Sequence, residues 1–393
     1  MLEAKYGLPE RVEFCARCCI SNQRPSSVVE HLASPEDAKP TIEFINGVCA
    51  ACYEADRKAL TDWSIQEQKL KNLLAEYRRS DGHYDVLVPG SGGKDSFYAA
   101  HVLKHRYGMH PLTCTWAPHL YTDVGRRNHR RFCAVADNYL LTPNEGVHRL
   151  LTRIALETLF HPFQPFVLGQ KAFPPRLAQQ LGIGLVMYGE SAREYGNGAD
   201  DGPEVARGYY SPQGDLRLAG VLTKELVARH GIAMQDFAAY LPLDAYVDMP
   251  DVRYLGYYLK WKPQEMYYYA CEKGGFEAAP ERTPGTYSKY NSLDDKLDDL
   301  HYWTTYIKFG IGRATYDAAQ EIRSGDITRE EGVALVKRFD GEYPERFERE
   351  VFEYLSVPGF PEMNRERLFM LADKFKSPHL WDGNQLRSTV WNP

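Results

Sequence analysis

Long apolar runs are missing from this sequence of 393 residues. A helix that crosses a bilayer needs about 20 consecutive apolar residues, and no stretch of that kind is present. The first residues, Met1–Tyr6, also lack the apolar region of a secretory signal. These absences argue against a membrane-spanning or secreted protein, and we expect a cytoplasmic one with no membrane partner.

An excess of basic residues is missing as well. The formal net charge is −6, whereas a protein that holds nucleic acid through its phosphates carries a positive field. The sequence therefore does not favour nucleic acid as a partner. One local basic run, Arg126–Arg131, leaves two interpretations open: a solvated helix face, or a contact with a polyanion or nucleotide.

The length and pattern of the chain predict an α/β fold with smaller units attached. A chain of 393 residues is too long for one ordinary domain, and 44% hydrophobic residues are enough to bury a core. Short apolar runs at Val86–Val88, Leu112–Trp116 and Gly184–Tyr188 alternate with helical stretches. This alternation is typical of a parallel sheet, whose following loops share one crevice. We expect a cysteine-rich segment with a linking helix (1–80), the sheet domain (81–250) and a helical C-terminal region (251–393).

The cysteines form two pairs near the N-terminus. Of the eight cysteines, four stand as Cys15/Cys18 and Cys49/Cys52, and about thirty residues separate the pairs. This spacing predicts a structural Zn²⁺ site with four thiolate ligands in a reducing compartment. A closed site of this kind has no open coordination position, so we assign it no catalytic role. Four buried, reduced thiols are the alternative interpretation, and Cys19 is expected to be spare.

The strongest signal is a strand, a glycine-rich turn and a helix start in direct succession, Val86–Ala100. Glycines allow close approach of the backbone, and free amides at a helix N-terminus bind anions. Hydroxyl groups and one lysine add donors and a positive charge for phosphate. The residues of this turn expected to contact a nucleotide are Gly90, Ser91, Gly92, Gly93, Lys94, Asp95 and Ser96.

The spacing within the turn distinguishes two kinds of phosphate site. A Walker A loop requires a glycine where Val88 stands and a Ser or Thr where Asp95 stands. The run Ser91–Ser96 instead resembles the SGGxDS signature of the PP-loop ATP pyrophosphatases. That resemblance implies an adenine nucleotide alpha hydrolase-like fold and cleavage of ATP to AMP and pyrophosphate. We interpret Asp95 as a ligand of Mg²⁺ or of a water network, because a triphosphate needs a divalent partner that prefers oxygen.

Further candidates follow the other apolar runs and lie near the C-terminus. Glu190 emerges after one run and Trp116 ends another, so both are expected at the crevice. Lys308 and Arg313 stand among glycines that weaken a helix, which favours an anionic contact. The open alternatives are a solvated acid for Glu190 and an i,i+4 pair with Asp317 for Arg313. We expect catalytic roles for Lys94, Asp95, Glu190 and Lys308, and nucleotide contacts from Trp116 and Arg313 as well as the turn.

Several helices are predicted from periodicity. Trp63–Arg79 has an apolar face that should pack on the next domain. In the C-terminal region the clearest helices are Asp294–Arg323 and Arg329–Phe339, the second with Thr328 as its cap and Glu331 as the capping-box partner. Most of the carboxylates at the start of the first of these helices are best explained by the helix dipole.

The cysteine pairs, the turn, Tyr188–Glu190 and especially Asp294–Asp298 through Gly310–Arg323 and Ile327–Gly332 resemble the N-acetyl sugar amidotransferase family. The resemblance implies conversion of an acetamido group on a bacterial surface sugar to an acetamidino group. It further implies that ATP adenylates the amide oxygen and that ammonia replaces it. The acceptor would be a nucleotide-linked diacetamido uronic acid or a nonulosonic acid.

The same family resemblance implies that another protein supplies the ammonia. Met1 and Leu2 provide no N-terminal cysteine nucleophile, and none of Cys114, Cys133 and Cys271 lies in a glycine-flanked strand-to-helix elbow. The resemblance implies a separate glutaminase subunit and a cyclase-like subunit that channels ammonia.

Two other functions remain as alternatives. A transfer-RNA thiolase also combines a PP-loop with cysteine-paired zinc, but it calls for catalytic cysteines near the loop and a basic face. A zinc-bearing scaffold with a degenerate nucleotide pocket is the non-enzymatic alternative.

Overall fold

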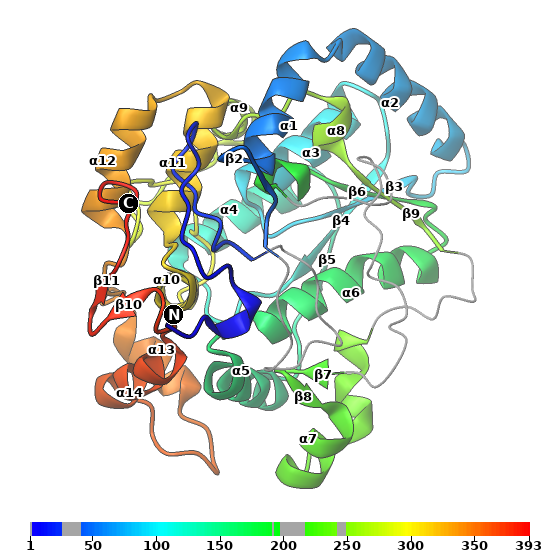
Figure 1. Cartoon of the computed structure of the whole chain (residues 1–393). Coiled ribbons are helices and arrows are strands. Elements are labelled where there is room, and N and C mark those ends of the chain that lie inside the picture. Colours follow the sequence, from blue (N-terminus) through cyan, green and yellow to red (C-terminus); the bar gives the residue numbers. More distant parts are fainter. Residues whose placement is uncertain (1, 26–40, 191, 197–216, 242–248) are drawn as a thin grey trace.

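A computed structural model of the chain describes residues 2–25, 41–190, 192–196, 217–241 and 249–393. Its centre is a five-stranded sheet in the order β5-β4-β3-β6-β9 (Figure 1). All four pairings are parallel, so the predicted α/β class with a parallel sheet is confirmed. The strands are β3 (Val86–Pro89), β4 (Pro111–Trp116), β5 (Asn138–Leu141), β6 (Leu185–Tyr188) and β9 (Asp251–Tyr254).

The central strands are apolar because helices cover both faces of the sheet. Along β3, Val86 and Val88 face one core while Leu87 faces another. The first core includes α2 (Trp63–Tyr77) and α3 (Lys94–His105), and the second includes α5 (Glu145–Leu159) and α6 (Gln164–Gln180). Leu70 and Leu74 of α2 are fully buried, which confirms the predicted packing face of that helix.

The C-terminal region is helical, but one predicted helix is wrong in extent. The expected helix Asp294–Arg323 is two helices, α10 (Asp298–Phe309) and α11 (Arg313–Ser324). Gly310 ends α10 with a φ of +67°, a conformation that favours glycine. The next helix, α12 (Arg329–Phe339), begins as predicted with the Thr328 and Glu331 capping box.

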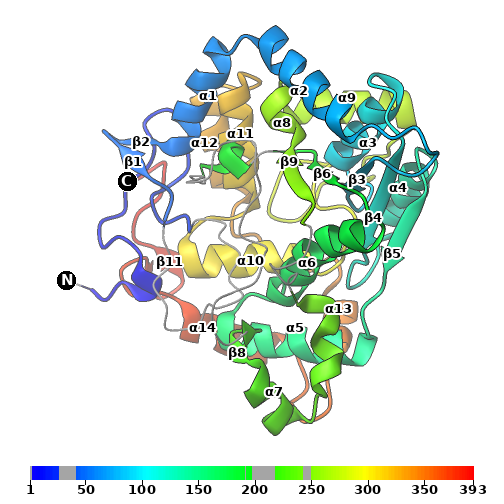
Figure 2. The same cartoon turned by 90° about the vertical axis from the view of Figure 1, so that its right-hand side faces the viewer.

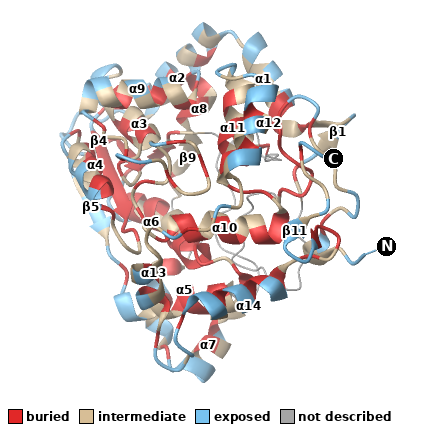
Figure 3. Cartoon of the chain, turned by 90° about the vertical axis from the view of Figure 1, so that its left-hand side faces the viewer, coloured by how far each residue is buried: buried red, intermediate tan, exposed pale blue. Residues whose placement is uncertain are grey.

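The N-terminal segment packs against the C-terminal helices. Figures 1 and 2 both show α1 (Ala50–Leu60) and β2 beside α11. The four paired cysteines share an apolar cluster with Ile311, Ala318 and Val336. The apolar core on one face of the sheet includes α10, whereas α11 and α12 contribute to the separate cluster that holds the cysteines. Figure 3 colours buried residues red and exposed residues pale blue in these helices.

The remaining elements connect these layers. Among the described residues, no helix is both long enough and apolar enough to span a bilayer. The other helices are α4 (Asp123–Cys133), α7 (Thr223–His230), α8 (Leu255–Tyr258), α9 (Pro263–Gly274), α13 (Glu348–Leu355) and α14 (Arg365–Phe375). Three short turns are 3₁₀ helices, η1 (Lys5–Gly7), η2 (Ala192–Tyr195) and η3 (Met234–Tyr240). The two-residue strands are β1 (Phe44–Ile45), β2 (Val48–Cys49), β7 (Arg217–Leu218), β8 (Val221–Leu222), β10 (Trp381–Asp382) and β11 (Gln385–Leu386).

Candidate active site and metal centre

The glycine-rich turn joins β3 to α3 at the carboxyl edge of the sheet. Gly92 has a φ of +95°, and a Cβ there would lie 2.8 Å from His129 Cα. A Cβ on Gly90 would lie 2.1 Å from Ser96 Cβ. Side chains are therefore excluded at both positions. Gly93 is the N-cap of α3 without a side-chain cap bond, which leaves the first amides of the helix open to an anion.

The turn follows β3, the strand at which the strand order of the sheet reverses. From β3 the chain adds β4 and β5 on one side and β6 and β9 on the other. Ligands of open parallel sheets bind at such a switch point. A cavity of about 640 Å³ opens there and is lined by Ser91–Asp95, by Glu190, and by residues of α10 and α11. Its volume is within the range of small-molecule sites, about 300–1,000 Å³.

Lys94 and Asp95 form an ion pair at this cavity. Lys94 Nζ lies 2.7 Å from Asp95 Oδ2, and Asp95 Oδ1 accepts a hydrogen bond of 2.8 Å from Trp261 Nε1. Lys94 is only 8% exposed, so its ammonium is held close to the turn. A bound triphosphate could compete for the ammonium and leave the carboxylate to a divalent cation.

Glu190 joins the same cavity from the end of β6. Gly189 permits the close approach, because a Cβ there would lie 2.7 Å from the carbonyl oxygen of Asp95. The Tyr195 hydroxyl donates a hydrogen bond to Glu190 Oε2. Burial, and then the charge of Asp95, raise the pKa of Glu190 to about 7. A carboxyl group that titrates near neutrality therefore lies beside the turn.

The opposite wall comes from α10 and α11. Lys308 is 4% exposed, lines the cavity and donates a hydrogen bond of 2.7 Å to Leu159 O. Arg313 Nε lies 3.0 Å from Asp317 Oδ1, and its guanidinium stacks 4.4 Å from the centre of the Tyr302 ring. The i,i+4 pair is thus present, and Arg313 also lines the cavity. Burial raises the pKa of Asp298 to about 7 although Arg313 acts against the shift.

Three residues expected to contact a nucleotide do not line the cavity. Trp116 is 4% exposed in the core, where its indole packs on Gly169 of α6. Its position in β4 puts it on the same face as the buried Leu112 and Cys114. Gly90 packs against the Ser96 side chain, and the Ser96 hydroxyl donates a hydrogen bond of 3.1 Å to Gly93 O. These three residues therefore stand outside the lining of the cavity.

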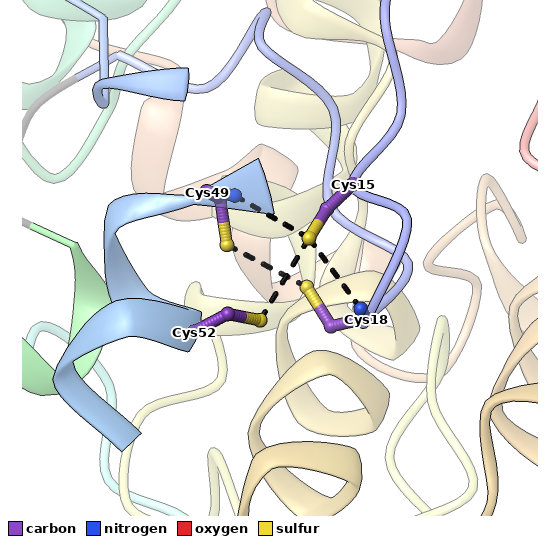
Figure 4. Close-up of side chains that lie close together, drawn as sticks. All are labelled: Cys15, Cys18, Cys49 and Cys52. Carbon is purple, nitrogen blue, oxygen red and sulfur yellow. Dashed lines mark hydrogen bonds between the residues drawn. The ribbon is translucent and has the colours of Figure 1, made fainter. Parts of the chain in front are cut away.

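The two cysteine pairs come together as the sequence predicts. Their four sulfur atoms lie within 4.8 Å of one another and all four side chains are buried (Figure 4). The Sγ atoms of Cys15 and Cys52 are 3.7 Å apart, as are those of Cys18 and Cys49. Backbone amides of Cys18 and Cys49 point to Cys15 Sγ at 3.5 and 3.4 Å.

These distances fit a tetrahedral metal. With Zn–S bonds of about 2.3 Å, a tetrahedral site separates its sulfur atoms by about 3.8 Å. The cluster could therefore hold a metal such as zinc without rearrangement of the backbone. A metal bound to all four cysteines would have no open coordination position, which is the arrangement of a structural site.

The C-terminal wall of the cavity matches a known family. Residues 284–392 match the model of the family described as LPS biosynthesis protein WbpG-like, C-terminal domain. The matched residues include α10, α11 and α12. No curated protein matches the chain.

The matched residues 284–392, called here the WbpG-like region, also link the cysteine cluster to the glycine-rich turn. Arg323 in α11 lies 4.0 Å from Cys18 Sγ and donates a hydrogen bond of 3.0 Å to Glu194 O. Glu194 forms an ion pair of 2.5 Å with Lys58, which also donates to Trp261 O at 2.9 Å. Since the Trp261 indole binds Asp95, a continuous set of contacts joins the cluster to the turn.

Some residues of the site carry no recognisable signal in the sequence. Trp261 holds Asp95 from a distant segment, and Arg24 lines the cavity from the N-terminal segment. Asp294 of the WbpG-like region also lines the cavity, and its pKa is raised by burial despite a hydrogen bond with Ser91. The helix-dipole explanation of this aspartate from the sequence missed its contact with the turn.

Proposed function

We propose that the chain is the synthetase subunit of an ATP-dependent amidotransferase that acts on a bacterial surface-sugar precursor. The observation that carries the proposal is the Ser91–Ser96 turn, which lies at the switch point of the sheet beside a large cavity. The match of residues 284–392 to a lipopolysaccharide-biosynthesis domain supports a sugar acceptor. The reaction converts an acetamido group to an acetamidino group.

The turn suits a nucleotide whose outer phosphates leave together. Amides at the start of α3 and the Lys94 ammonium can neutralise charge on the departing pyrophosphate. Asp95 and Glu190 supply carboxylate oxygens for Mg²⁺, the ligand type that this ion prefers. Products are then AMP and pyrophosphate, as expected for a PP-loop ATP pyrophosphatase.

The amide oxygen of the acceptor is a poor leaving group, so ATP must activate it before ammonia can replace it. The amide oxygen attacks the α-phosphorus of ATP, the bond between the α-phosphorus and the bridging oxygen breaks, and pyrophosphate leaves. Ammonia then adds to the imidate carbon, loses a proton, and AMP departs with the former amide oxygen. Asp298, with a pKa of about 7, is suited to accept that proton.

Ammonia comes from a separate glutaminase in this proposal, delivered through a cyclase-like channelling subunit. Cys114 is 1% exposed, and burial raises its pKa. Cys133 lies 3.7 Å from His129 Nε2, but burial raises the pKa of the thiol and lowers that of the imidazole. Both shifts favour the neutral thiol and the neutral imidazole, whereas an activated nucleophile needs a thiolate.

The most informative experiment identifies the sugar that the protein amidinates. The purified chain is incubated with ATP, Mg²⁺, ammonium and candidate sugars with two acetamido groups, and the products are examined by mass spectrometry. We expect the small mass decrease that results when one oxygen atom becomes an NH group. A sugar that gains phosphate or adenylate without amidination, or no turnover with any acetamido sugar, would contradict the proposed reaction.

A further inference from the structure

Arg24 brings a buried positive charge from the cysteine-rich segment to the cavity. It stands between the two cysteine pairs in the sequence and lines the cavity together with Glu190 and Tyr195. The residue is only 4% exposed, and its buried Nε has no hydrogen-bond partner within the described parts of the chain. A guanidinium stays charged in proteins, so this placement is costly unless an anion binds there.

Among the residues that the structure describes, no carboxylate balances the charge of Arg24. Burial lowers its pKa, and the neighbours that act on it most are Tyr316, Arg323 and Tyr195. The guanidinium carbon lies 5.2 Å from the centre of the Tyr316 ring and 5.6 Å from that of Tyr195. Aromatic faces hold a guanidinium in place but do not neutralise it. In the described part of the chain, Arg24 is thus oriented and has no anionic partner.

The cysteine cluster fixes the backbone that carries Arg24. Cys15 N donates to Ile20 O at 2.8 Å, which closes the turn that begins at the first cysteine pair. Arg24 N donates to Ser21 O at 3.3 Å, and Arg24 O accepts from Ile42 N at 3.1 Å. A ligand that meets Arg24 therefore meets a side chain whose position is already set, which reduces the entropy lost on binding.

The surroundings of Arg24 indicate which anion it meets. The Tyr195 ring beside Arg24 carries the hydroxyl that binds Glu190, and Glu190 interacts with Asp95 and Lys94 of the turn. We infer that Arg24 binds a phosphate group of the nucleotide, so that the metal-binding segment forms part of the nucleotide site. Arginine is the preferred residue for such a contact because its planar fork matches phosphate oxygens. This inference rests on the proposed function.

The test compares nucleotide binding by Arg24→Met, Arg24→Lys and the wild-type full chain. Calorimetry measures the affinity for α,β-methylene-ATP with Mg²⁺, for inorganic pyrophosphate and for AMP, each alone. Arg17→Met is the matched control, because Arg17 belongs to the same segment but is 45% exposed and pairs with Asp56. Zinc content and thermal melting show whether each variant is folded.

We expect Arg24→Met to bind the ATP analogue about tenfold or more weakly, with Arg24→Lys in between and Arg17→Met unchanged. If Arg24→Met binds pyrophosphate more weakly than the wild type does, Arg24 contacts an outer phosphate. If it binds AMP more weakly, Arg24 contacts the inner phosphate. If a folded, zinc-loaded Arg24→Met binds all three ligands as the wild type does, the inference is wrong. If the wild type itself binds neither the analogue nor pyrophosphate, the proposed function fails instead.

Discussion

In the proposed reaction, Lys94 is the residue on which neutralisation of the departing pyrophosphate depends most directly. Its ammonium is already held at the cavity by Asp95. Lys94→Ala should lower pyrophosphate release by roughly a hundredfold, the usual size of a lost electrostatic contact in a transition state. The measurement is steady-state pyrophosphate release at saturating Mg·ATP. Lys104→Ala is the matched control, because Lys104 lies at the other end of α3 and donates to Val135 O; equal activity of the two variants would refute the role.

If the cavity binds Mg·nucleotide as proposed, Glu190 should make that binding depend on pH. Its pKa of about 7 in the folded protein, raised by burial, means that the carboxyl group is mainly neutral below pH 7 and charged above it. A Mg·nucleotide prefers the charged form, so affinity should rise with pH between 6 and 8, by at most about tenfold per pH unit. Calorimetry with Mg·α,β-methylene-ATP across this range measures the slope.

The variant Glu190→Gln separates Glu190 from the other carboxyl group with a similar pKa. Glu190→Gln should bind the analogue more weakly and with a flat pH profile. Asp298→Asn should retain the slope, because Asp298 lies on the opposite wall, in α10. A slope that persists in Glu190→Gln and disappears in Asp298→Asn would reverse the assignment.

How far single residues could be predicted depends on how local their signal is. The four cysteines and Lys94, Asp95 and Glu190 stand in short motifs, and the structure brings the last three to one cavity. Trp116 ends an apolar run as expected, but strand alternation turns its side chain into the core. Arg24 and Trp261 reach the site only through tertiary packing, which no spacing in the sequence reports.

The segment that connects the cysteine cluster to the turn is α1. Cys52 lies in its first turn, and Lys58 near its end contacts both Glu194 and the backbone of Trp261. Metal removal, by chelation or by Cys15→Ser, should therefore lower the melting temperature and also weaken binding of Mg·α,β-methylene-ATP by about tenfold, or ~1.4 kcal/mol. Zinc content, thermal melting and calorimetry on the same samples test this; full nucleotide affinity in a folded, metal-free protein would show that the cluster and the site are independent.

Lys58→Met breaks this connection without removing a sulfur ligand. It should keep its zinc and lose nucleotide affinity in the same direction as metal removal. Lys71→Met is a suitable control, because Lys71 is 52% exposed on α2 and forms an i,i+4 ion pair with Glu67 on the same helix.

At the level of elements, the strand, turn and helix around Val86–Ala100 could be predicted because each carries its own local pattern. The break between α10 and α11 was missed, although Gly310 and Gly312 were recognised as weakening the helix. Asp340 explains why the break is stable, since its carboxylate accepts the amides of Gly312 and Thr315 at 3.0 and 3.1 Å. That support comes from the next helix and is not visible in the local sequence.

On the scale of the whole molecule, the account requires ammonia to arrive from outside the chain. The isolated protein should convert acceptor with high ammonium and show no turnover above background with glutamine, because Cys114 and Cys133 are not activated. Product formation with each nitrogen source, measured on the purified single chain, tests this. Robust use of glutamine by this chain alone would show that a glutaminase site has been overlooked.

The identity of the nucleotide products tests the central claim most directly. The turn at Ser91–Ser96 is proposed to hold the two outer phosphates as one leaving group while the inner phosphorus is attacked. Purified protein is incubated with Mg·ATP, ammonium and an accepted sugar, and the products are separated by chromatography and assigned by phosphorus NMR. The account predicts AMP and pyrophosphate in equal amounts, whereas ADP and orthophosphate would contradict it.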